Sequence, residues 1–465
     1  MKRKIYDQLL SWKSDRNGTC LTVKGQRQIG KTYIIEKFAS DNYRHVVKID
    51  FSANPEFKSI FENGHDVGSL VAAIELKFGL DPIVPEDTLF FFDEIQDCPD
   101  AHASLKQFAI DGRYHVIASG SLLGVTNVLS HRKKDERPLS PMGYERVLVM
   151  YPMDFEEYLW AVGFPIDKLD SVKKHISDRT ELTSTELEVV SAHFRDYMIV
   201  GGMPAAVRDF VKSGSYAEAG IQQDIILSNV INDINRYNDL VNALKTQKCF
   251  ESIPEQLSSG NKKYHYSRVE NGTGSRGSAQ KYFENLMWIE EAGYGNFCYA
   301  LESPELPFRR IPDSFKVYLS DTGLLIRMMG RSAAIAVYDG RSEYNRGALT
   351  ENVVAECLMK CGIKPHYYRK SSGTSQLEID FVVDLLGESA VIEVKSGKSR
   401  ESPSIEKAGR LFHVGRRIKL ENGNIRMDED GIEHYPLFVA SFIKLLERQW
   451  DGPEFRALTR LCPSR

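Results

Sequence analysis

A phosphate-binding loop is the first group of residues whose types and spacing could do chemistry. Residues 21–39, LTVKGQRQIGKTYIIEKFA, place a glycine-bounded loop between an apolar run and an amphipathic run. The backbone N–H groups of such a loop, together with the N-terminus of the following helix, can surround phosphate oxygens. Its lysine can reach the outer phosphates, and its threonine hydroxyl can bind Mg²⁺. We predict a nucleotide-phosphate site formed by Gly25, Gln26, Arg27, Gln28, Ile29, Gly30, Lys31, Thr32 and Tyr33.

Two carboxylates at the end of a second apolar run could complete this site. Residues 88–97, TLFFFDEIQD, predict a buried parallel strand that ends in Asp93 and Glu94. In open α/β sheets, ligands bind at the carboxyl ends of the strands. We therefore expect Asp93 to hold Mg²⁺ through water, and Glu94 to orient and deprotonate an attacking water molecule.

Two further strands are predicted around the acidic strand, at residues 45–52 and 114–121. An extra strand between the phosphate loop and the acidic strand, with a glutamate beside the aspartate, resembles the AAA and STAND branch of the P-loop ATPases. In that branch a polar residue on the next strand senses the terminal phosphate. The resemblance implies that Ser119 or Ser121 has this role.

The order of motifs along the chain extends the resemblance. GQRQIGKT, DEIQ, SGSLL, YPMDFEEYL, GGMP, YLSDTGLL, ENVVAECL and IDFVV…IEVKS follow one another as in a prokaryotic family of AAA-type ATPases with a C-terminal domain of unknown function. Gln26 and Tyr33 depart from the usual loop of that family, and neither change touches a phosphate ligand. The resemblance implies ATP hydrolysis with ATP and Mg²⁺ as cofactors. Similarity to a STAND motif implies that Pro204, two residues after Gly202, lies against the adenine; a plain turn is the alternative.

The middle of the chain carries no catalytic constellation. Residues 249–259 and 276–295 predict two short helices, the second with Phe283, Leu286 and Met287 at helical spacing, and residues 296–302 can return as a strand. This order resembles a winged helix, which often follows the core of AAA and STAND proteins. Its basic residues could touch nucleic-acid phosphates; the alternative is a module that packs on the nucleotide domain and transmits its state. These basic residues are Lys262, Lys263, Arg268 and Arg276.

Charged residues interrupt two apolar strands nearer the C-terminus, in EIDFVVDLLGESAVIEVKS (residues 378–396). An isolated buried charge costs several kcal/mol unless it is paired or holds a metal. If the strands pair about Gly387-Glu388, Asp380 lies opposite Lys395 and Val382 lies opposite Glu393. Asp380, Glu393 and Lys395 then share one face, because side chains alternate with period two. A predicted helix over GALTENVVAECLMKCG places Glu351 on an inward face.

These four residues could form a metal-dependent site. Two carboxylates can hold a divalent cation, and an ammonium group can hold or activate a water molecule. The pattern resembles the restriction-endonuclease-like nuclease core, which implies a second Mg²⁺ or Mn²⁺ on Asp380 and Glu393, with Lys395 as the stabilising cation and Glu351 as a further ligand or base. Structural salt bridges in a fold that cleaves nothing are the alternative. Glu378 and Tyr368 could line the same pocket.

Length and composition indicate a modular globular protein. The chain has 465 residues, and its 60 basic and 64 acidic side chains give a net charge of −4, so no chain-wide basic field attracts nucleic acid. A local cluster could support DNA or form a solvated edge: Arg410, Arg416, Arg417 and Lys419. No run approaches the roughly 20 apolar residues that span a bilayer, so we expect a cytoplasmic protein.

We predict an α/β fold with three domains. These are a P-loop ATPase domain with a parallel sheet at residues 1–204, a helical and winged-helix-like domain at 205–332 and a restriction-endonuclease-like domain at 333–465. The first functional hypothesis is an ATPase whose nucleotide state controls the attached modules, on or near DNA. The second is an ATP-gated metal-dependent DNA nuclease, and the third is a STAND-type nucleotide-gated interaction protein with little turnover. DNA, a protein partner and a second copy of the chain are candidate partners, and Arg146 is a candidate arginine finger.

Overall fold

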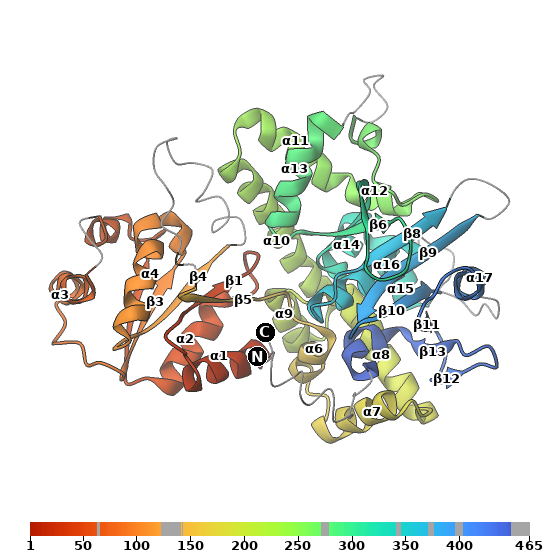
Figure 1. The fold of residues 1–465 in the computed structure, drawn as a ribbon, viewed down its shortest axis with the longest axis horizontal. Coiled ribbons are helices and arrows are strands. Elements are labelled where there is room, and N and C mark those ends of the chain that lie inside the picture. Colours follow the sequence, from red (N-terminus) through yellow and green to blue (C-terminus); the bar gives the residue numbers. More distant parts are fainter. Residues whose placement is uncertain are drawn as a thin grey trace.

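The amino-terminal part of the chain is a parallel sheet with helices on both faces (Figure 1). The computed structural model describes residues 1–62, 66–121, 141, 143–270, 279–340, 346–370, 376–395 and 403–447. The sheet has the order β2-β3-β4-β1-β5, and all of its strand pairs are parallel. Its strands are β1 (Cys20–Lys24), β2 (His45–Asp50), β3 (Thr88–Asp93), β4 (His115–Gly120) and β5 (Glu145–Val149).

The two faces of this sheet pack into separate apolar cores. Phe91 and its neighbours on one face pack with α1 and α2, whereas Phe90 and Phe92 on the other face pack with α3 and α4. Because both faces are covered, β3 is apolar from Leu89 to Phe92 and ends at Asp93. The covering helices are α1 (Ile5–Ser14), α2 (Lys31–Asn42), α3 (Val67–Phe78) and α4 (Pro99–Asp111); two short 3₁₀ helices, η1 (Pro55–Ile60) and η2 (Ile95–Asp97), follow β2 and β3.

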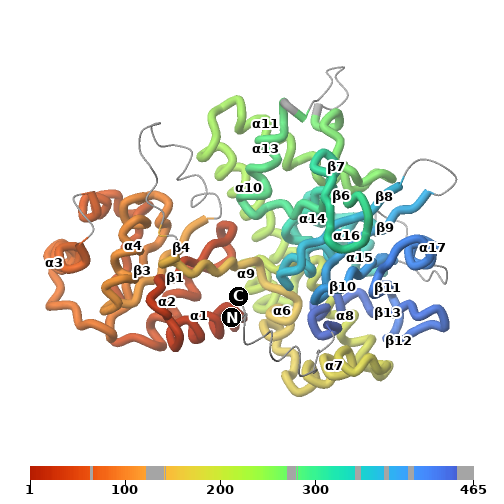
Figure 2. The backbone as a smooth tube through the Cα atoms, in the orientation of Figure 1, coloured from red at the N-terminus to blue at the C-terminus, as the bar shows by residue number. Residues whose placement is uncertain are grey.

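A helical region follows β5 and lies between the parallel sheet and the C-terminal strands (Figure 2). It begins with α6 (Phe155–Ala161), α7 (Ile166–Asp178), α8 (Ser184–Val200), α9 (Pro204–Ser213) and α10 (Tyr216–Tyr237). It continues with α11 (Leu240–Glu251), α12 (Ile253–Ser258), η3 (Tyr266–Glu270) and α13 (Ala279–Glu291). Later helices are α14 (Thr322–Met329), α15 (Arg331–Tyr338), α16 (Arg346–Lys360), α17 (Pro403–Leu411) and the 3₁₀ segment η4 (Leu437–Leu446).

The C-terminal strands form a mixed eight-stranded sheet in the order β12-β13-β11-β10-β9-β8-β6-β7. Its strands are β6 (Gly295–Leu301), β7 (Arg310–Leu319), β8 (His366–Lys370), β9 (Leu377–Leu385), β10 (Glu388–Val394), β11 (Arg416–Glu421), β12 (Arg426–Met427) and β13 (Glu433–Pro436). The expected wing strand, β6, pairs with β8 of the C-terminal part. The sheet therefore spans the proposed domain boundary at residue 332, which remains a prediction.

The α/β class with a P-loop-like parallel sheet is confirmed, and it is followed by a helical region and a mixed sheet. The winged-helix and restriction-endonuclease-like assignments remain predictions. Among the helices that the structure describes, we find none with the length and apolar character needed to cross a membrane.

The pairing of β9 with β10 differs from the predicted register by two residues. Val391 lies opposite Val382, so the numbers of opposite residues sum to 773 and not to 775. The turn is formed by Leu386 and Gly387, both with positive φ (51° and 84°), as a two-residue hairpin of type I′ requires. Continued by one step, this register brings Asp380 opposite Glu393, so the predicted pairing with Lys395 is wrong. A two-residue shift keeps the same face, because side chains alternate with period two.

Candidate nucleotide site

The phosphate loop connects β1 to α2 at the carboxyl edge of the parallel sheet. Gly25 lies against the backbone of Met150, where a Cβ atom would come within 2.4 Å of the carbonyl oxygen. Gly30 precedes α2 with a φ of 88°, in the left-handed region that glycine adopts at low cost. Both glycines are therefore required by the backbone, which curls over the N-terminus of α2 as a phosphate site requires.

Lys31 is buried at the centre of this loop. Its Nζ atom donates hydrogen bonds to the carbonyl oxygens of Gly25 and Gln26, each at 2.9 Å. Burial lowers the pKa of Lys31 to about 8, against the opposing effect of the nearby carboxylates of Glu94 and Asp93. A phosphate group in the loop would give this ammonium a stronger partner than two carbonyls.

Three side chains contact or approach the Asp93 carboxylate at the end of β3. The Thr32 hydroxyl lies 3.1 Å from Oδ2, the Ser119 hydroxyl donates to Oδ1, and the Lys48 ammonium lies 3.4 Å from Oδ2. A hydroxyl and a carboxylate are oxygen ligands of the kind that Mg²⁺ prefers, with water and phosphate oxygens as its remaining ligands. Thr32 and Asp93 therefore fit a Mg²⁺ ion that accompanies a nucleotide.

Glu94 follows Asp93 in a strained backbone conformation. Its φ of 52° lies in the left-handed region, which non-glycine residues adopt at a cost of about 1–3 kcal/mol and mostly at functional sites. The carboxylate accepts a hydrogen bond from Gln96 and lies 3.9 Å from the Arg27 guanidinium. Glu94 also lines a cavity of ≈ 360 Å³ with Thr32 and Asp93, where a water molecule can be held beside the metal site.

An apolar cavity of ≈ 400 Å³ lies on the other side of the phosphate loop. Pro204 lines it at the start of α9, and a Cβ atom on Gly30 would be 4.0 Å from the Pro204 ring. The exposed Tyr33 ring also lines this cavity. Its remaining lining residues are Met1, Arg3, Gln28, Ile29, Met153, Ala205 and Arg208. The position and apolar character of this cavity suit a nucleotide base.

The loop containing Gly202 and Pro204 is held from the C-terminal half of the chain. The Gly202 N–H donates to Asp321 Oδ2 at 2.6 Å, and the other oxygen of Asp321 caps α14 through the Leu324 N–H at 3.0 Å. Asp321 is therefore the N-cap of α14. Gln26 in the phosphate loop accepts a hydrogen bond from the Ser320 hydroxyl at 3.0 Å. Gln26, which differs from the usual residue of the family loop, thus contacts the segment between β7 and α14.

Some residues of the site gave no signal in the sequence. Arg3 is buried and donates to the carbonyl oxygens of Ile29 (2.9 Å) and Tyr151 (2.6 Å). Lys48 is a single lysine within an apolar strand, a weak sign that its side chain faces a charged partner.

The structure places Ser119 against Asp93, whereas Ser121 lies buried just beyond β4. Arg146, the candidate finger, is exposed on the edge strand β5 opposite Leu21.

The predicted C-terminal set comes together as a charged cluster. Burial, followed by the nearby carboxylates of Glu351 and Glu393, raises the pKa of Asp380 to about 8. Asp380 accepts a hydrogen bond from the Val394 N–H at 2.9 Å, and Lys395 donates to Glu393 Oε1 at 2.5 Å. The second oxygen of Glu393 is buried and has no hydrogen-bond partner among the described residues.

Two lysines that the sequence did not single out for this cluster neutralise part of its charge. Lys316 is buried and lies 3.6 Å from Glu351 and 3.4 Å from Glu378. Lys262 donates to the other oxygen of Glu351, so it faces the cluster and not a phosphate backbone. Tyr368 packs instead in an apolar core beside Phe412. Within the described ranges, no group of three or more histidine, cysteine, aspartate or glutamate side chains is arranged to hold a metal ion.

Several of the other basic residues are also occupied in the fold. Arg268 donates to the Ser259 hydroxyl at 2.6 Å, and Arg276 lies outside the described residues. In the C-terminal cluster, Arg416 pairs with Glu433 at 2.6 Å, and Lys419 is buried 3.2 Å from Glu421. The prediction of a solvated basic edge is therefore wrong for Arg416 and Lys419, because both charges are directed into the fold. Arg410 is exposed, and Arg417 donates to the carbonyl oxygen of Asp430.

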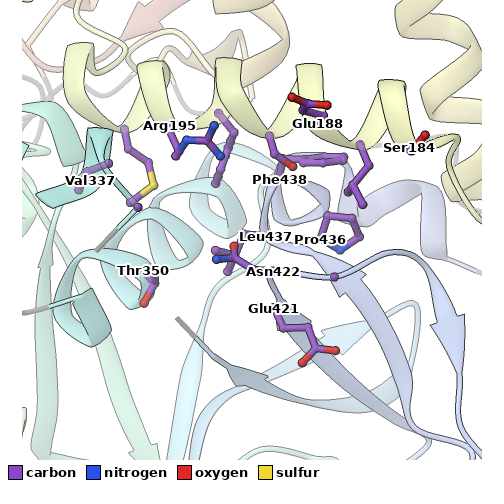
Figure 3. Close-up of a pocket in the computed structure, with 16 residues that line it drawn as sticks. Ser184, Glu188, Arg195, Val337, Thr350, Glu421, Asn422, Pro436, Leu437 and Phe438 are labelled. Carbon is purple, nitrogen blue, oxygen red and sulfur yellow. The ribbon is translucent and has the colours of Figure 1, made fainter. Parts of the chain in front are cut away.

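A larger cavity of ≈ 650 Å³ lies elsewhere, between α8 and the start of η4 (Figure 3). Glu188 and Arg195 border it from α8, and Leu437 and Phe438 border it from the opposite side. None of its described lining residues belongs to the predicted nucleotide site.

Comparison with family models divides the chain into three segments. Residues 17–159 match a family described as an AAA domain. The amino-terminal part is thus an AAA-type P-loop domain. Residues 191–334 and 346–437 match two families that are each described as a domain of unknown function. No curated protein matches the chain as a sequence.

Several solved structures resemble the chain at low sequence identity. The Walker-type ATPase of Pyrococcus abyssi is 13% identical with a TM-score of 0.40, over 70% of this chain and 95% of that one. The RuvB Holliday junction branch migration motor of Thermotoga maritima is 12% identical with a TM-score of 0.25, over 68% and 92%. A STAND protein with a tetratricopeptide repeat sensor from Pyrococcus horikoshii is 13% identical with a TM-score of 0.25, over 77% and 45%. Because these TM-scores lie below 0.5, we draw nothing further from them.

Proposed function

We propose that the protein binds ATP as its Mg²⁺ complex and hydrolyses it, and that its nucleotide state controls the helical region and the C-terminal sheet. The observation that carries this proposal is the convergence of Lys31, Thr32, Asp93 and Ser119 at the carboxyl edge of the parallel sheet, beside Glu94. Bound Mg²⁺ would neutralise charge on the phosphates. The protein's own part is to orient the phosphates and to accept a proton from the attacking water.

Each residue has a separate task in this mechanism. Lys31 exchanges its two carbonyl partners for the outer phosphates of the nucleotide. Thr32 and Asp93 hold the metal, and Ser119 keeps the Asp93 carboxylate in place through its hydrogen bond. Glu94 takes the proton of the attacking water at its carboxylate. Pro204 and the apolar cavity beside it take the base.

The test combines nucleotide binding with turnover. Lys31→Ala should weaken Mg·ATP binding by about 100-fold or more, because the buried ammonium is removed from the phosphate loop. Glu94→Gln should bind ATP as the wild type does and lose about 10²–10⁴ in kcat, the usual contribution of a general base. Lys37→Ala removes an exposed lysine of α2 and serves as the control.

The outcomes separate the hypotheses. Wild-type protein that binds neither ATP nor ADP with Mg²⁺, in calorimetry and in a fluorescent-nucleotide assay, would overturn the proposal. Binding without measurable phosphate release would favour a STAND-type interaction protein with little turnover. An unchanged rate in Glu94→Gln would show that another group activates the water.

A metal-dependent nuclease is the second candidate function. It is favoured by the approach of Asp380 to Glu393 beside Lys395, and by the buried and unbonded oxygen of Glu393. In this proposal Asp380 and Glu393 take Mg²⁺ or Mn²⁺, Lys395 stabilises the developing phosphate charge, and Glu351 serves as a further ligand or base. The ion pairs of Glu351 with Lys262 and Lys316 favour the alternative, in which the charged cluster only stabilises the fold. The two proposals predict opposite results in a cleavage assay.

Supercoiled, linear and branched DNA, each with Mg²⁺ or Mn²⁺, provide the test of this second function. Cleavage should require both Asp380 and Lys395, and it should disappear in Asp380→Asn and Lys395→Ala. Binding of DNA without cleavage, with affinity that falls as salt rises, would support an ATPase that acts on DNA. If the protein neither binds nor cuts these substrates, DNA is not its partner.

A further inference from the structure

Arg27 stands in the phosphate loop between two polar cavities. One cavity, of ≈ 360 Å³, contains Thr32, Asp93 and Glu94 among its lining residues. The other, of ≈ 480 Å³, lies between the loop and α10 and includes Glu94 and Asp233. Arg27 and Glu94 line both cavities, so the arginine borders the place where the metal and the attacking water are expected.

The present partners of Arg27 belong mainly to α10. Nη1 lies 3.2 Å from Asp233 Oδ1, and Nη2 donates to the Tyr237 hydroxyl at 2.5 Å. Nη2 also lies 3.9 Å from Glu94 Oε2. The guanidinium has five N–H donors, and its Nε atom is buried without a hydrogen-bond partner among the described residues. At least one N–H donor of Arg27 is therefore unused by the described residues.

We propose that Arg27 binds the terminal phosphate of the bound nucleoside triphosphate and releases Asp233 when it does so. This inference deepens the proposed ATPase function and rests on it. The terminal phosphate of a P-loop nucleotide lies between the loop lysine, the metal and the residue that activates water. Arg27 is the guanidinium beside that place, and guanidinium groups bind phosphate oxygens in a bidentate manner. A diphosphate lacks the group that Arg27 would bind, so Arg27 would distinguish ATP from ADP from within the same chain.

Asp233 connects the phosphate loop to the mixed sheet, so loss of its ion pair with Arg27 would affect both. Its second oxygen accepts a hydrogen bond from the Tyr294 hydroxyl at 2.8 Å, and Tyr294 precedes β6 of the mixed sheet. Asp233 is buried, and a buried carboxylate that loses its cation must find a new partner or become exposed. Release of Asp233 would therefore favour movement of α10, which contacts both the nucleotide site and the start of the mixed sheet.

The test compares ADP with a non-hydrolysable ATP analogue, both with Mg²⁺. Arg27→Ala should leave the ADP Kd within about threefold of wild type and raise the Kd of the analogue by about tenfold or more. It should lower kcat by about 10³-fold or more, since arginines in this role contribute about 10³–10⁵. Arg27→Lys keeps the charge and loses the bidentate fork, so it should restore part of the affinity and little of kcat. Arg44→Ala, which removes an exposed arginine before β2, is the matched control.

A second measurement addresses Asp233. Asp233→Asn removes the competing charge, so the Kd of the analogue relative to that of ADP should fall. Amide exchange in α10 should be faster with the analogue than with ADP in wild type, and equal with both ligands in Arg27→Ala. Thermal unfolding of each variant shows whether the fold is retained.

Particular results would overturn the inference. Equal weakening of ADP and analogue binding in Arg27→Ala would assign the arginine a structural role alone. An unchanged kcat in a folded Arg27→Ala protein would exclude contact with the terminal phosphate. These failures differ from failure of the ATPase proposal itself, in which the wild type binds no nucleotide or releases no phosphate.

Discussion

The lowered pKa of Lys31 predicts that nucleotide binding depends on pH in an unusual range. Lys31 is buried against two carbonyl oxygens, and burial brings its pKa to about 8. Phosphate groups favour the charged form, so binding of ATP raises this pKa. The protein therefore takes up a fraction of a proton on binding that increases as the pH rises through about 8, and its affinity for ATP falls over the same range.

The size of the effect follows from the pKa. A lysine with a pKa of about 8 is about 90% protonated at pH 7 and about 10% protonated at pH 9. If the bound form keeps the proton, the Kd for Mg·ATP should rise about ninefold between these pH values, equivalent to about 1.3 kcal/mol. A lysine with the ordinary pKa of about 10.4 would change the Kd by less than about 5% over the same range.

Isothermal titration calorimetry in pairs of buffers with different ionisation enthalpies measures the protons directly. Binding should take up about 0.1, 0.5 and 0.9 protons at pH 7, 8 and 9. Lys31→Arg is the control, because a guanidinium stays charged over this range, and its uptake should be near zero at each pH. Equal proton uptake in wild type and Lys31→Arg at pH 9, or an unchanged wild-type Kd, would refute the reasoning.

Four further substitutions test other parts of the structure. Ser119→Ala removes the hydroxyl that holds the Asp93 carboxylate, and kcat should fall about tenfold, as one lost hydrogen bond of about 1–1.5 kcal/mol predicts; steady-state phosphate release measures it. Gly202→Ala would place a Cβ atom 2.1 Å from a backbone oxygen, so urea unfolding should show a loss of more than about 2 kcal/mol and titration should show weaker nucleotide binding. Lys316→Met removes the buried cation that lies 3.6 Å from Glu351 and should cost about 3–5 kcal/mol. Lys395→Met, at a half-exposed lysine, should cost less than about 1 kcal/mol.

Local patterns predicted much of the nucleotide site. The strands that end in Lys24 and Asp93 were expected from apolar runs, and parallel strands in one sheet bring their carboxyl ends to the same edge. Lys31, Thr32 and Asp93 therefore meet for reasons that are visible in the sequence. The position of Arg27 in the phosphate loop was predicted, but its ion pair with Asp233 was not visible, because Asp233 lies more than two hundred residues away on a helix with no motif.

The mixed sheet was less predictable from local patterns. The alternation of side chains placed Asp380 and Glu393 on one face in either register, but the opposite partner depended on a turn at Leu386 and Gly387. The buried face of α13 also differs from the one that the spacing of Phe283, Leu286 and Met287 predicted. Phe283 is exposed, whereas Tyr282 and Leu286 are buried. In both cases several arrangements satisfy the local pattern, and packing against distant segments selects one.

The sequence by itself determined the phosphate loop, the acidic strand and the amino-terminal α/β sheet, because each depends on spacing within a short segment. Tertiary structure decided which charges pair. Lys316 with Glu351, Arg416 with Glu433 and Asp321 with the Gly202 N–H are contacts between separate elements, and the last joins residues 119 positions apart. A buried charge needs a partner of opposite charge or a hydrogen-bond partner. The packing of whole elements, and not residue type or spacing, determines which residue becomes that partner.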